Sequence, residues 1–201
     1  MEEKVVTLEL KELLSNNHIK RLILPFFDTF DSGKLDDDIQ VFLKEHALDY
    51  EKSGIARTTL IFDKKRTELL GYFTIGLNTI KFNKTIKRYC GYKKVKEAYP
   101  GIDLFKHNLR PVYKLFMIGK NYNAQTDTKG FMDYCFNDLI WERIYACNSL
   151  VGTNLMYLDC ENNDNLIKKY QKQGFEVYEK YEYNDETSGV IVKMVRMITN
   201  V

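Results

Sequence analysis

Alternation of apolar and polar residues predicts a strand and a helix near the start of the chain. Residues 5–10 alternate as a β-strand does. Residues 18–27 form an apolar run that Pro25 closes. Three aspartates, residues 36–38, then precede apolar residues at helical spacing, and negative charge is favoured at a helix start. This pattern predicts a helix near residues 37–51.

The next segments predict a hairpin followed by a lysine-rich region. Residues 57–63 and 69–77 are rich in β-branched and aromatic residues, and a short polar link joins them. Together they are typical of an antiparallel hairpin. In the lysine-rich stretch 78–111 we expect a further strand, Thr79 to Phe82, and then one or two short helices.

The second half of the chain predicts a strand–helix–strand–helix–strand–strand order. Pro111 precedes a strand over residues 112–119, and a helix over 129–145 carries an apolar face formed by Met132, Cys135, Phe136, Leu139, Ile140 and Ile144. The remaining predicted elements are a strand at 153–160, a helix at 164–173 that Gly174 ends, and strands at 175–183 and 189–198.

This order predicts an α/β fold. A strand–helix–strand unit favours a parallel pair with a right-handed crossover, while the hairpins before and after it make the sheet mixed. We therefore expect one domain over residues 1–201, with a mixed, twisted β-sheet flanked by helices. No internal repeat, low-complexity tract or linker interrupts the sequence.

Composition excludes several classes of protein. The 201 residues are 44% hydrophobic and 29% charged, which is ordinary for a soluble domain. The net charge of +2 is too small to indicate nucleic-acid binding by itself. No apolar run approaches the roughly 20 residues of a membrane span, and the first residues lack the pattern of a signal peptide, so we expect a cytoplasmic protein with no membrane partner. Four scattered cysteines and three scattered histidines predict reduced thiols and no metal site.

The segment 152–179 carries the most specific pattern. An apolar run ends at an acidic, Asn-rich turn, a short helix carries Tyr170, and after Gly174 a new strand begins at Phe175. This order resembles the C-terminal half of the GNAT superfamily of N-acetyltransferases. The resemblance implies an enzyme that transfers an acetyl group from acetyl-CoA to a primary amine by direct attack in a ternary complex. It also implies that the parallel strands 112–119 and 153–160 splay apart, with the pantetheine arm in the gap.

The same resemblance implies the groups that bind acetyl-CoA. Backbone groups of Ile118, Gly119 and Lys120 are expected to pair with the pantetheine amides, because an extended ligand that carries amides can pair like an added strand. The pyrophosphate is expected on the loop 123–132, through Gln125, Lys129, Gly130 and Phe131. The second glycine of the family's loop is missing here, so the start of an ordinary helix, capped by Asp127 or Thr128, is the alternative.

Three further residues have both a functional and a structural interpretation. Tyr170 matches the position of the proton donor to the departing thiolate, or is a packed aromatic residue. Asn163 is placed to contact the pantetheine arm, or caps the helix that follows it. Glu161 is a candidate general base, or a solvated acid at the end of a strand.

The acceptor and the partners stay open at this stage. Some GNAT relatives with similar segments resemble toxins that acetylate aminoacyl-tRNA. The stretch 80–96 interleaves tyrosines with lysines and an arginine, which fits either an RNA-binding patch or a solvated surface. The hypotheses are therefore an N-acetyltransferase for an unknown amine, a CoA-binding module without turnover, and a toxin acting on charged tRNA. A homodimer and an antitoxin are also open.

Overall fold

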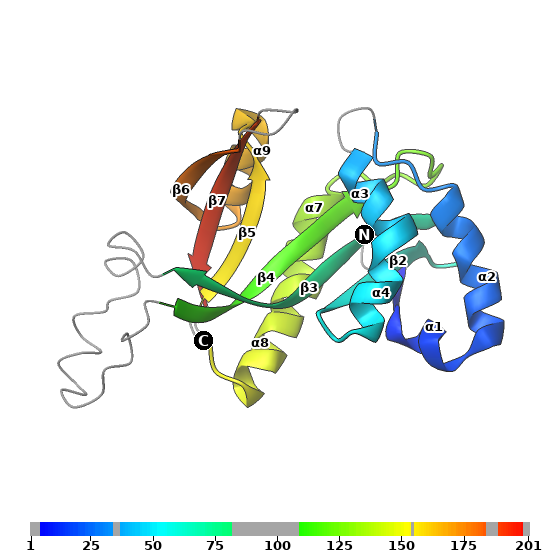
Figure 1. Cartoon of the computed structure of the whole chain (residues 1–201). Helices are drawn as coiled ribbons and strands as arrows, with labels where there is room; N and C mark the ends of the chain where they lie inside the picture. The colour runs from blue at the N-terminus through cyan, green and yellow to red at the C-terminus, as the bar shows by residue number, and fades with distance from the viewer. Residues whose placement is uncertain (1–4, 34–36, 82–108, 154, 184–188, 199–201) are drawn as a thin grey trace. The chain divides into compact units, whose positions relative to one another are not determined.

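The computed structural model describes residues 5–33, 37–81, 109–153, 155–183 and 189–198. Its strands form one seven-stranded mixed sheet in the order β1-β2-β3-β4-β5-β7-β6, with β4 and β5 parallel (Figure 1). The strand bounds are β1 Val5–Glu9, β2 Ala56–Asp63, β3 Leu69–Lys81, β4 Leu109–Lys120, β5 Leu155–Glu161, β6 Glu176–Tyr183 and β7 Gly189–Met197. The predicted α/β class and mixed sheet are confirmed.

The chain divides into two compact units, and both β3 and β4 pass from one to the other. Unit 1 consists of Met1–Gly76 and Leu115–Arg143, and unit 2 of Leu77–Lys114 and Ile144–Val201. The expectation of one domain over residues 1–201 stays a prediction.

Unit 1 holds β1, β2 and most of β3, together with a layer of helices. These helices are α1 (Lys11–Ser15), α2 (Asn17–Asp28), α3 (Asp37–Val41), the π-helical turn η2 (Phe42–His46) and α4 (Ala47–Lys52). The helix predicted near 37–51 is confirmed as the continuous run from α3 to α4. Its apolar face joins a core that includes Leu10, Phe27, Phe42, Leu60 and Tyr72.

The apolar run at residues 18–27 is helical, although Pro25 lies inside it. The Asn16 side-chain oxygen caps α2 by accepting from the N–H groups of His18 and Ile19 at 3.0 and 3.2 Å. From this start, Ile19, Ile23 and Leu24 fall on the face that packs against the unit 1 core. Burial of this face stabilises the helix despite the backbone donor that Pro25 lacks.

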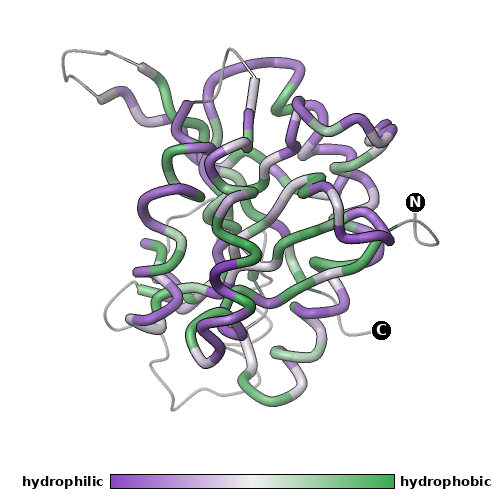
Figure 2. Tube along the Cα trace, turned by 90° about the vertical axis from the view of Figure 1, so that its right-hand side faces the viewer, coloured by the Kyte–Doolittle hydropathy of each residue, from purple (hydrophilic) through white to green (hydrophobic). Residues whose placement is uncertain are grey.

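The helix predicted at 129–145 is present as α7 (Phe131–Tyr134), the π-helical turn η3 (Cys135–Ile140) and α8 (Trp141–Leu150). Cys135, Phe136, Leu139, Ile140 and Ile144 are buried, as their spacing predicts, whereas Met132 is half-buried. Figure 2 shows that helical stretches carry both hydrophilic and hydrophobic turns. Such mixed surfaces suit helices that cover one face of a sheet.

Unit 2 contains β5, β7 and β6, with α9 (Asp164–Lys172) between β5 and β6. β7 pairs antiparallel with both of its neighbours: Tyr157 lies opposite Val195, and Lys180 opposite Val192. A small apolar cluster on this sheet is formed by Ile80, Val112, Leu155, Tyr157 and Val195. The predicted strands at 153–160, 175–183 and 189–198 and the helix at 164–173 are confirmed within one or two residues, with residue 154 outside the description.

One predicted element is wrong, and others lie outside the description. Thr79 to Lys81 are not a separate strand but the end of β3, which runs without a break from Leu69. The short helices expected within 78–111 and most of the basic stretch 80–96 lie outside the described residues. Within the described ranges, no helix is long and apolar enough to cross a bilayer. The same ranges hold no group of three or more His, Cys, Asp or Glu residues placed to bind a metal ion.

Candidate functional site

The turn from β5 into α9 is organised by Asn163. Its side-chain oxygen accepts from the N–H groups of Asn165 and Leu166 at 3.0 and 3.3 Å, and its own backbone is extended. These bonds satisfy two of the donors that every helix start leaves without an intrahelical partner. The capping interpretation of Asn163 is confirmed, while a contact with pantetheine stays a prediction.

Tyr170 lies in the last turns of α9 and is buried, with 6% of its surface exposed. Its ring meets the Phe175 ring edge-on, with centroids 6.2 Å apart. Its carbonyl accepts from the N–H groups of Gln173 and Phe175 at 3.0 and 3.1 Å, which closes the helix end. Gly174 supplies the left-handed residue that this ending needs, with φ = 81°. Tyr170 is therefore held firmly in place, and its role as a proton donor stays a prediction.

Glu161 is the last residue of β5. Its side chain is exposed, and the residue pairs with Ile191 across the antiparallel ladder. Its carbonyl accepts from the Asn163 N–H at 2.8 Å, which bends the chain toward α9. The catalytic role of Glu161 stays a prediction.

The end of β4 that lies in unit 1 departs from regular alternation. The Phe116 ring meets Tyr50 of α4, and Met117 packs against the same helix-covered core. Successive side chains of a regular strand point to opposite faces, so two neighbours on one face indicate a bulge-like irregularity. It lies immediately before Ile118, Gly119 and Lys120, the residues predicted to pair with pantetheine.

Gly119 is required by packing. A Cβ atom at this position would lie 2.4 Å from Ile39 Cγ2 and 3.1 Å from a Tyr72 ring carbon. Ile118 and Lys120 are half-buried on either side of it. The Lys120 ammonium lies over the Tyr122 ring, 4.9 Å from the ring centroid. The backbone at Gly119 thus passes directly beneath the α3 layer, and its pairing with a ligand stays a prediction.

Asn121 anchors the chain where β4 ends. The side chain is buried and donates to the Leu69 carbonyl at 2.7 Å, while its oxygen accepts from the N–H groups of Asp31 and Asn123 at 3.1 and 3.0 Å. Its backbone N–H donates to the Leu70 carbonyl at 2.8 Å. These four bonds tie the loop after β4 to β3 and to the segment that follows α2. Sequence reasoning did not single out Asn121.

The first half of the predicted pyrophosphate loop is held by Glu68. Its carboxylate accepts from the Gln125 N–H at 2.8 Å, the Thr126 N–H at 3.0 Å and the Thr126 hydroxyl at 2.5 Å. The bond from the Thr126 hydroxyl, followed by that from the Gln125 N–H, lowers the pKa of Glu68. An internal anion therefore occupies two N–H groups of a loop predicted to bind an external one. No signal in the sequence marks Glu68 for this contact.

The second half of the loop turns at Gly130. Its φ is 75°, a Cβ placed there would meet nothing within 4 Å, and it forms the N-cap of α7 without a side-chain cap. The expectation that Asp127 or Thr128 caps this helix is therefore wrong. The Asp127 carboxylate accepts from the Lys129 N–H at 2.9 Å, and the Thr128 carbonyl accepts from the Phe131 N–H at 3.1 Å.

The side chain of Phe131 is part of the packed interior of unit 1. It is 4% exposed, and its ring lies against Gly71 of β3, where a Cβ would be 2.2 Å from the ring. Lys129 and Gly130 are exposed. The predicted residues therefore form two groups: residues 118–131 in unit 1, and Glu161, Asn163 and Tyr170 in unit 2.

Comparison with known proteins identifies the class of fold. No family profile matches the chain, and no curated protein matches its sequence. Solved structures do match, and they show that the chain has a GNAT-like fold, which confirms the resemblance seen in the sequence.

Three of these structures span most of the chain. A bacterial toxin superposes with a TM-score of 0.65 at 17% identity, covering 96% of this chain and 90% of its own. A tyrosine-to-phenylalanine mutant of KacT gives 0.59 at 17% identity, covering 94% of each chain. AtaT complexed with acetyl-methionyl-tRNAfMet gives 0.53 at 15% identity, covering 83% of this chain and 85% of its own. At such identities the likeness concerns the fold.

Proposed function

We propose that the chain is an acetyl-CoA-dependent N-acetyltransferase that acetylates the amino group of aminoacyl-tRNA, as a toxin does. The observation that carries the proposal is the likeness to a bacterial toxin over 96% of this chain, together with the likeness to AtaT in its complex with acetyl-methionyl-tRNAfMet over 83% of it. A further structure in the set, AtaTR with acetyl-CoA bound, has a TM-score of 0.56 at 14% identity. Acetyl-CoA as co-substrate and tRNA as partner follow from this proposal.

The residues of this chain fit acetyl-CoA in part. Gly130 has a left-handed backbone with open space where a Cβ would lie, and the exposed Lys129 beside it can neutralise phosphate charge. The N–H groups of Gln125 and Thr126 are engaged by Glu68. Phosphate binding is therefore assigned to the second half of the loop, at Lys129 and Gly130. Bound acetyl-CoA supplies an activated acyl group.

The proposed roles of the remaining residues follow from their positions. Backbone groups from Ile118 to Lys120 align the pantetheine arm, and a backbone N–H there stabilises developing negative charge on the carbonyl oxygen. The Tyr170 phenol donates a proton to the sulfur as the thiolate departs. The rigid ending of α9 at Gly174 keeps that phenol in one position. KacT, one of the similar structures, was solved as a tyrosine-to-phenylalanine mutant, which agrees with a functional tyrosine in this fold.

The test offers acetyl-CoA labelled in the acetyl group together with charged initiator methionyl-tRNA or bulk aminoacyl-tRNA. Labelled acetyl-aminoacyl-tRNA and an equal amount of free thiol are the expected products. Free amino acids, polyamines and a lysine peptide serve as alternative acceptors. Transfer to one of these, and not to charged tRNA, would keep the acetyltransferase and reject the tRNA substrate.

A CoA-binding module without turnover remains a second candidate. The specific observation in its favour is that Glu68 and Asp127 engage three backbone donors of the phosphate loop. Such a module predicts acetyl-CoA binding by calorimetry without thiol release in the presence of any acceptor. An antitoxin partner is a corollary of the toxin proposal, since AtaT has been solved with the C-terminus of its antitoxin AtaR. A homodimer stays a prediction.

A further inference from the structure

A cluster of polar side chains in unit 2 lies on the opposite face of the sheet from α9. Arg196 pairs with Met156 across the ladder and donates to the Gln173 carbonyl at the end of α9 at 2.5 Å, so α9 ends over the face that carries Arg196. Asp159 pairs with Lys193. Asp159 lies an odd number of residues after Met156 on β5, and Lys193 lies an odd number of residues before Arg196 on β7. Because neighbouring strand residues point to opposite faces, Asp159 lies on the face away from the end of α9.

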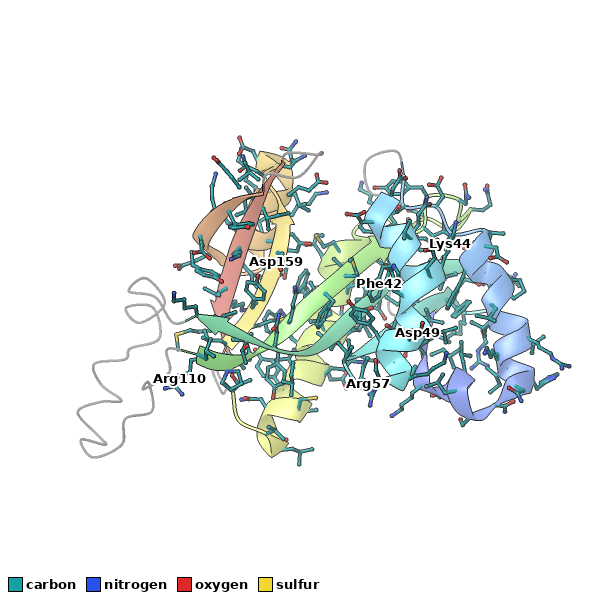
Figure 3. All side chains as sticks on the ribbon, in the orientation of Figure 1. Phe42, Lys44, Asp49, Arg57, Arg110 and Asp159 are labelled. Atoms are coloured by element: carbon teal, nitrogen blue, oxygen red, sulfur yellow. The ribbon has the colours of Figure 1, made fainter. Side chains whose placement is uncertain are left out.

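Two partners hold the Asp159 carboxylate. The Lys114 ammonium of β4 lies 2.8 Å from Oδ2, and the Tyr157 hydroxyl donates to Oδ1. The two charged side chains keep 19% and 29% of their surface exposed, for Lys114 and Asp159 respectively. An ionised carboxylate has about four acceptor positions, so these two partners leave room for a further donor. Figure 3 shows Asp159 on β5.

The surroundings of the pair are those that recognise an amine. The Lys114 ammonium also lies over the Tyr157 ring, 5.4 Å from its centroid, and the Tyr178 ring lies 6.1 Å from the Tyr157 ring. Aromatic faces and a carboxylate attract a nitrogen that carries polar hydrogens. Burial, the largest cause, and then the bond to Asp159 raise the pKa of Tyr157, so its phenol stays a donor. The amino group of Lys114 itself shows that these groups bind an amine, since it contacts both the Asp159 carboxylate and the Tyr157 ring.

We propose that Lys114 and Asp159 form the subsite for the acceptor amine. Asp159 accepts a hydrogen bond from an N–H of the incoming amine, and the Lys114 charge disfavours the ammonium form of that amine. This inference rests on the proposed function and deepens it. A neutral amine is required for attack, and a like charge nearby lowers the pKa of an ammonium group.

The reaction balances with these residues in place. The acceptor ammonium releases one proton to solvent, the neutral nitrogen forms a bond to the acetyl carbon, and the carbon–sulfur bond breaks. The amide nitrogen loses its second proton to solvent, while the thiolate takes one from Tyr170, which solvent reprotonates. The products are one amide, one thiol and one released proton. Asp159 and α9, which carries Tyr170, lie on opposite faces of the sheet, so acceptor and thiolate are handled from different sides.

Other charged groups face the pair from neighbouring strands. Lys193 of β7 lies directly opposite Asp159 and pairs with Glu179 of β6 at 2.8 Å. On β4, Arg110 shares the face of Lys114 by strand alternation. Tyr178 of β6 has a pKa that burial raises. Because Glu179 offsets Lys193, Lys114 is the cation that the proposal assigns to the amine.

The experiment measures acetyl transfer from acetyl-CoA to methionyl-tRNA as a function of pH, with acetyl-CoA affinity determined separately by calorimetry. For Asp159→Asn we expect kcat/KM for the acceptor to fall about tenfold or more, with unchanged acetyl-CoA affinity. For Lys114→Met we expect the acid limb of the kcat/KM profile to move to higher pH. Asp49→Asn is the control: it breaks the exposed ion pair between Asp49 and Lys52 in unit 1 and should stay within about twofold of the wild type.

The double variant Lys114→Met/Asp159→Asn separates a chemical role from a structural tie. It leaves no unpaired charge, so it tests the site even where Asp159→Asn alone folds poorly. We expect the double variant to remain impaired. Recovery to within about twofold of the wild type would show that the pair is a structural tie and would overturn the inference.

The remaining outcomes distinguish the inference from the proposed function. A wild type that transfers no acetyl group to methionyl-tRNA or to the other acceptors contradicts both. A wild type that transfers acetyl while Asp159→Asn behaves like the control Asp49→Asn contradicts the inference alone. If the acid limb of the kcat/KM profile of Lys114→Met lies at the same pH as that of the wild type, the role assigned to the Lys114 charge is contradicted.

Discussion

The Glu68 carboxylate accepts two bonds from Thr126, one from its hydroxyl at 2.5 Å and one from its backbone N–H at 3.0 Å. The two residues lie on different segments of unit 1, Glu68 just before β3 and Thr126 in the loop after β4. A third bond, from the Gln125 N–H, completes the contact. One acidic side chain therefore sets the conformation of the loop that is proposed to meet phosphate.

Replacing Glu68 with Gln should weaken the contact that holds this loop. It should also remove the pH dependence that the Glu68 carboxylate gives to the free energy of unfolding. We expect a loss of about 1–2 kcal/mol in the free energy of unfolding at neutral pH, since bonds to a charged acceptor are stronger than neutral ones. The lowered folded-state pKa of Glu68 means that its contribution is present above the ordinary value near 4.3 and is lost as pH falls through the lower folded value. Urea denaturation of both proteins between pH 7 and pH 3 measures this. A difference that stays constant with pH would contradict the assignment.

Replacing Tyr170 with Phe tests the proposed proton donor. Only the hydroxyl is removed and the ring contact with Phe175 is kept, so folding should change little. We expect kcat to fall about a hundredfold with acetyl-CoA affinity unchanged, in the range for loss of one general acid. Single-turnover assays with labelled acetyl-CoA measure the chemical step directly. Tyr181→Phe, an exposed tyrosine on β6, is the matched control. Equal rates for both variants would exclude Tyr170 as the acid.

Asn163 can be tested for its two interpretations separately. Asn163→Ala removes the cap of α9 and should destabilise the protein by about 1 kcal/mol. Asn163→Asp keeps a capping oxygen and should retain the stability of the wild type. If Asn163 also contacts pantetheine through its amide N–H, the Asp variant will lose acetyl-CoA affinity while remaining stable. Thermal unfolding and calorimetry together distinguish the two roles.

Gly119 should not tolerate even a methyl group. Gly119→Ala places a Cβ 2.4 Å from Ile39 Cγ2, and overpacking of this kind costs roughly 1–3 kcal/mol. The double variant Gly119→Ala/Ile39→Ala removes the closest atom and should be less destabilised than the sum of the two single changes. Gly152→Ala, where a Cβ meets nothing within 4 Å, is the control. Additive losses in chemical denaturation would show that the contact with Ile39 does not set the requirement.

Local patterns in the sequence determined the elements of this protein and two details of its candidate site. The spacing of apolar residues distinguished the helix that begins at Asp37 from the hairpin that follows it. An Asn before a helix or a Gly after one acts on backbone groups within four residues. Asn163 and Gly174 could therefore be interpreted correctly from their neighbours alone. The apolar run through Pro25 shows where local preference was insufficient, since burial of its helical face decided its structure.

Only the tertiary structure decided the contacts between distant residues. Glu68 reaches Gln125 and Thr126, and Lys114 of β4 meets Asp159 of β5. The alternation also breaks between Phe116 and Met117 because both pack under the same helix layer. Such contacts depend on which strands become neighbours and in which register. A sequence specifies this through the whole core, whereas each acid or lysine by itself suits any solvated position.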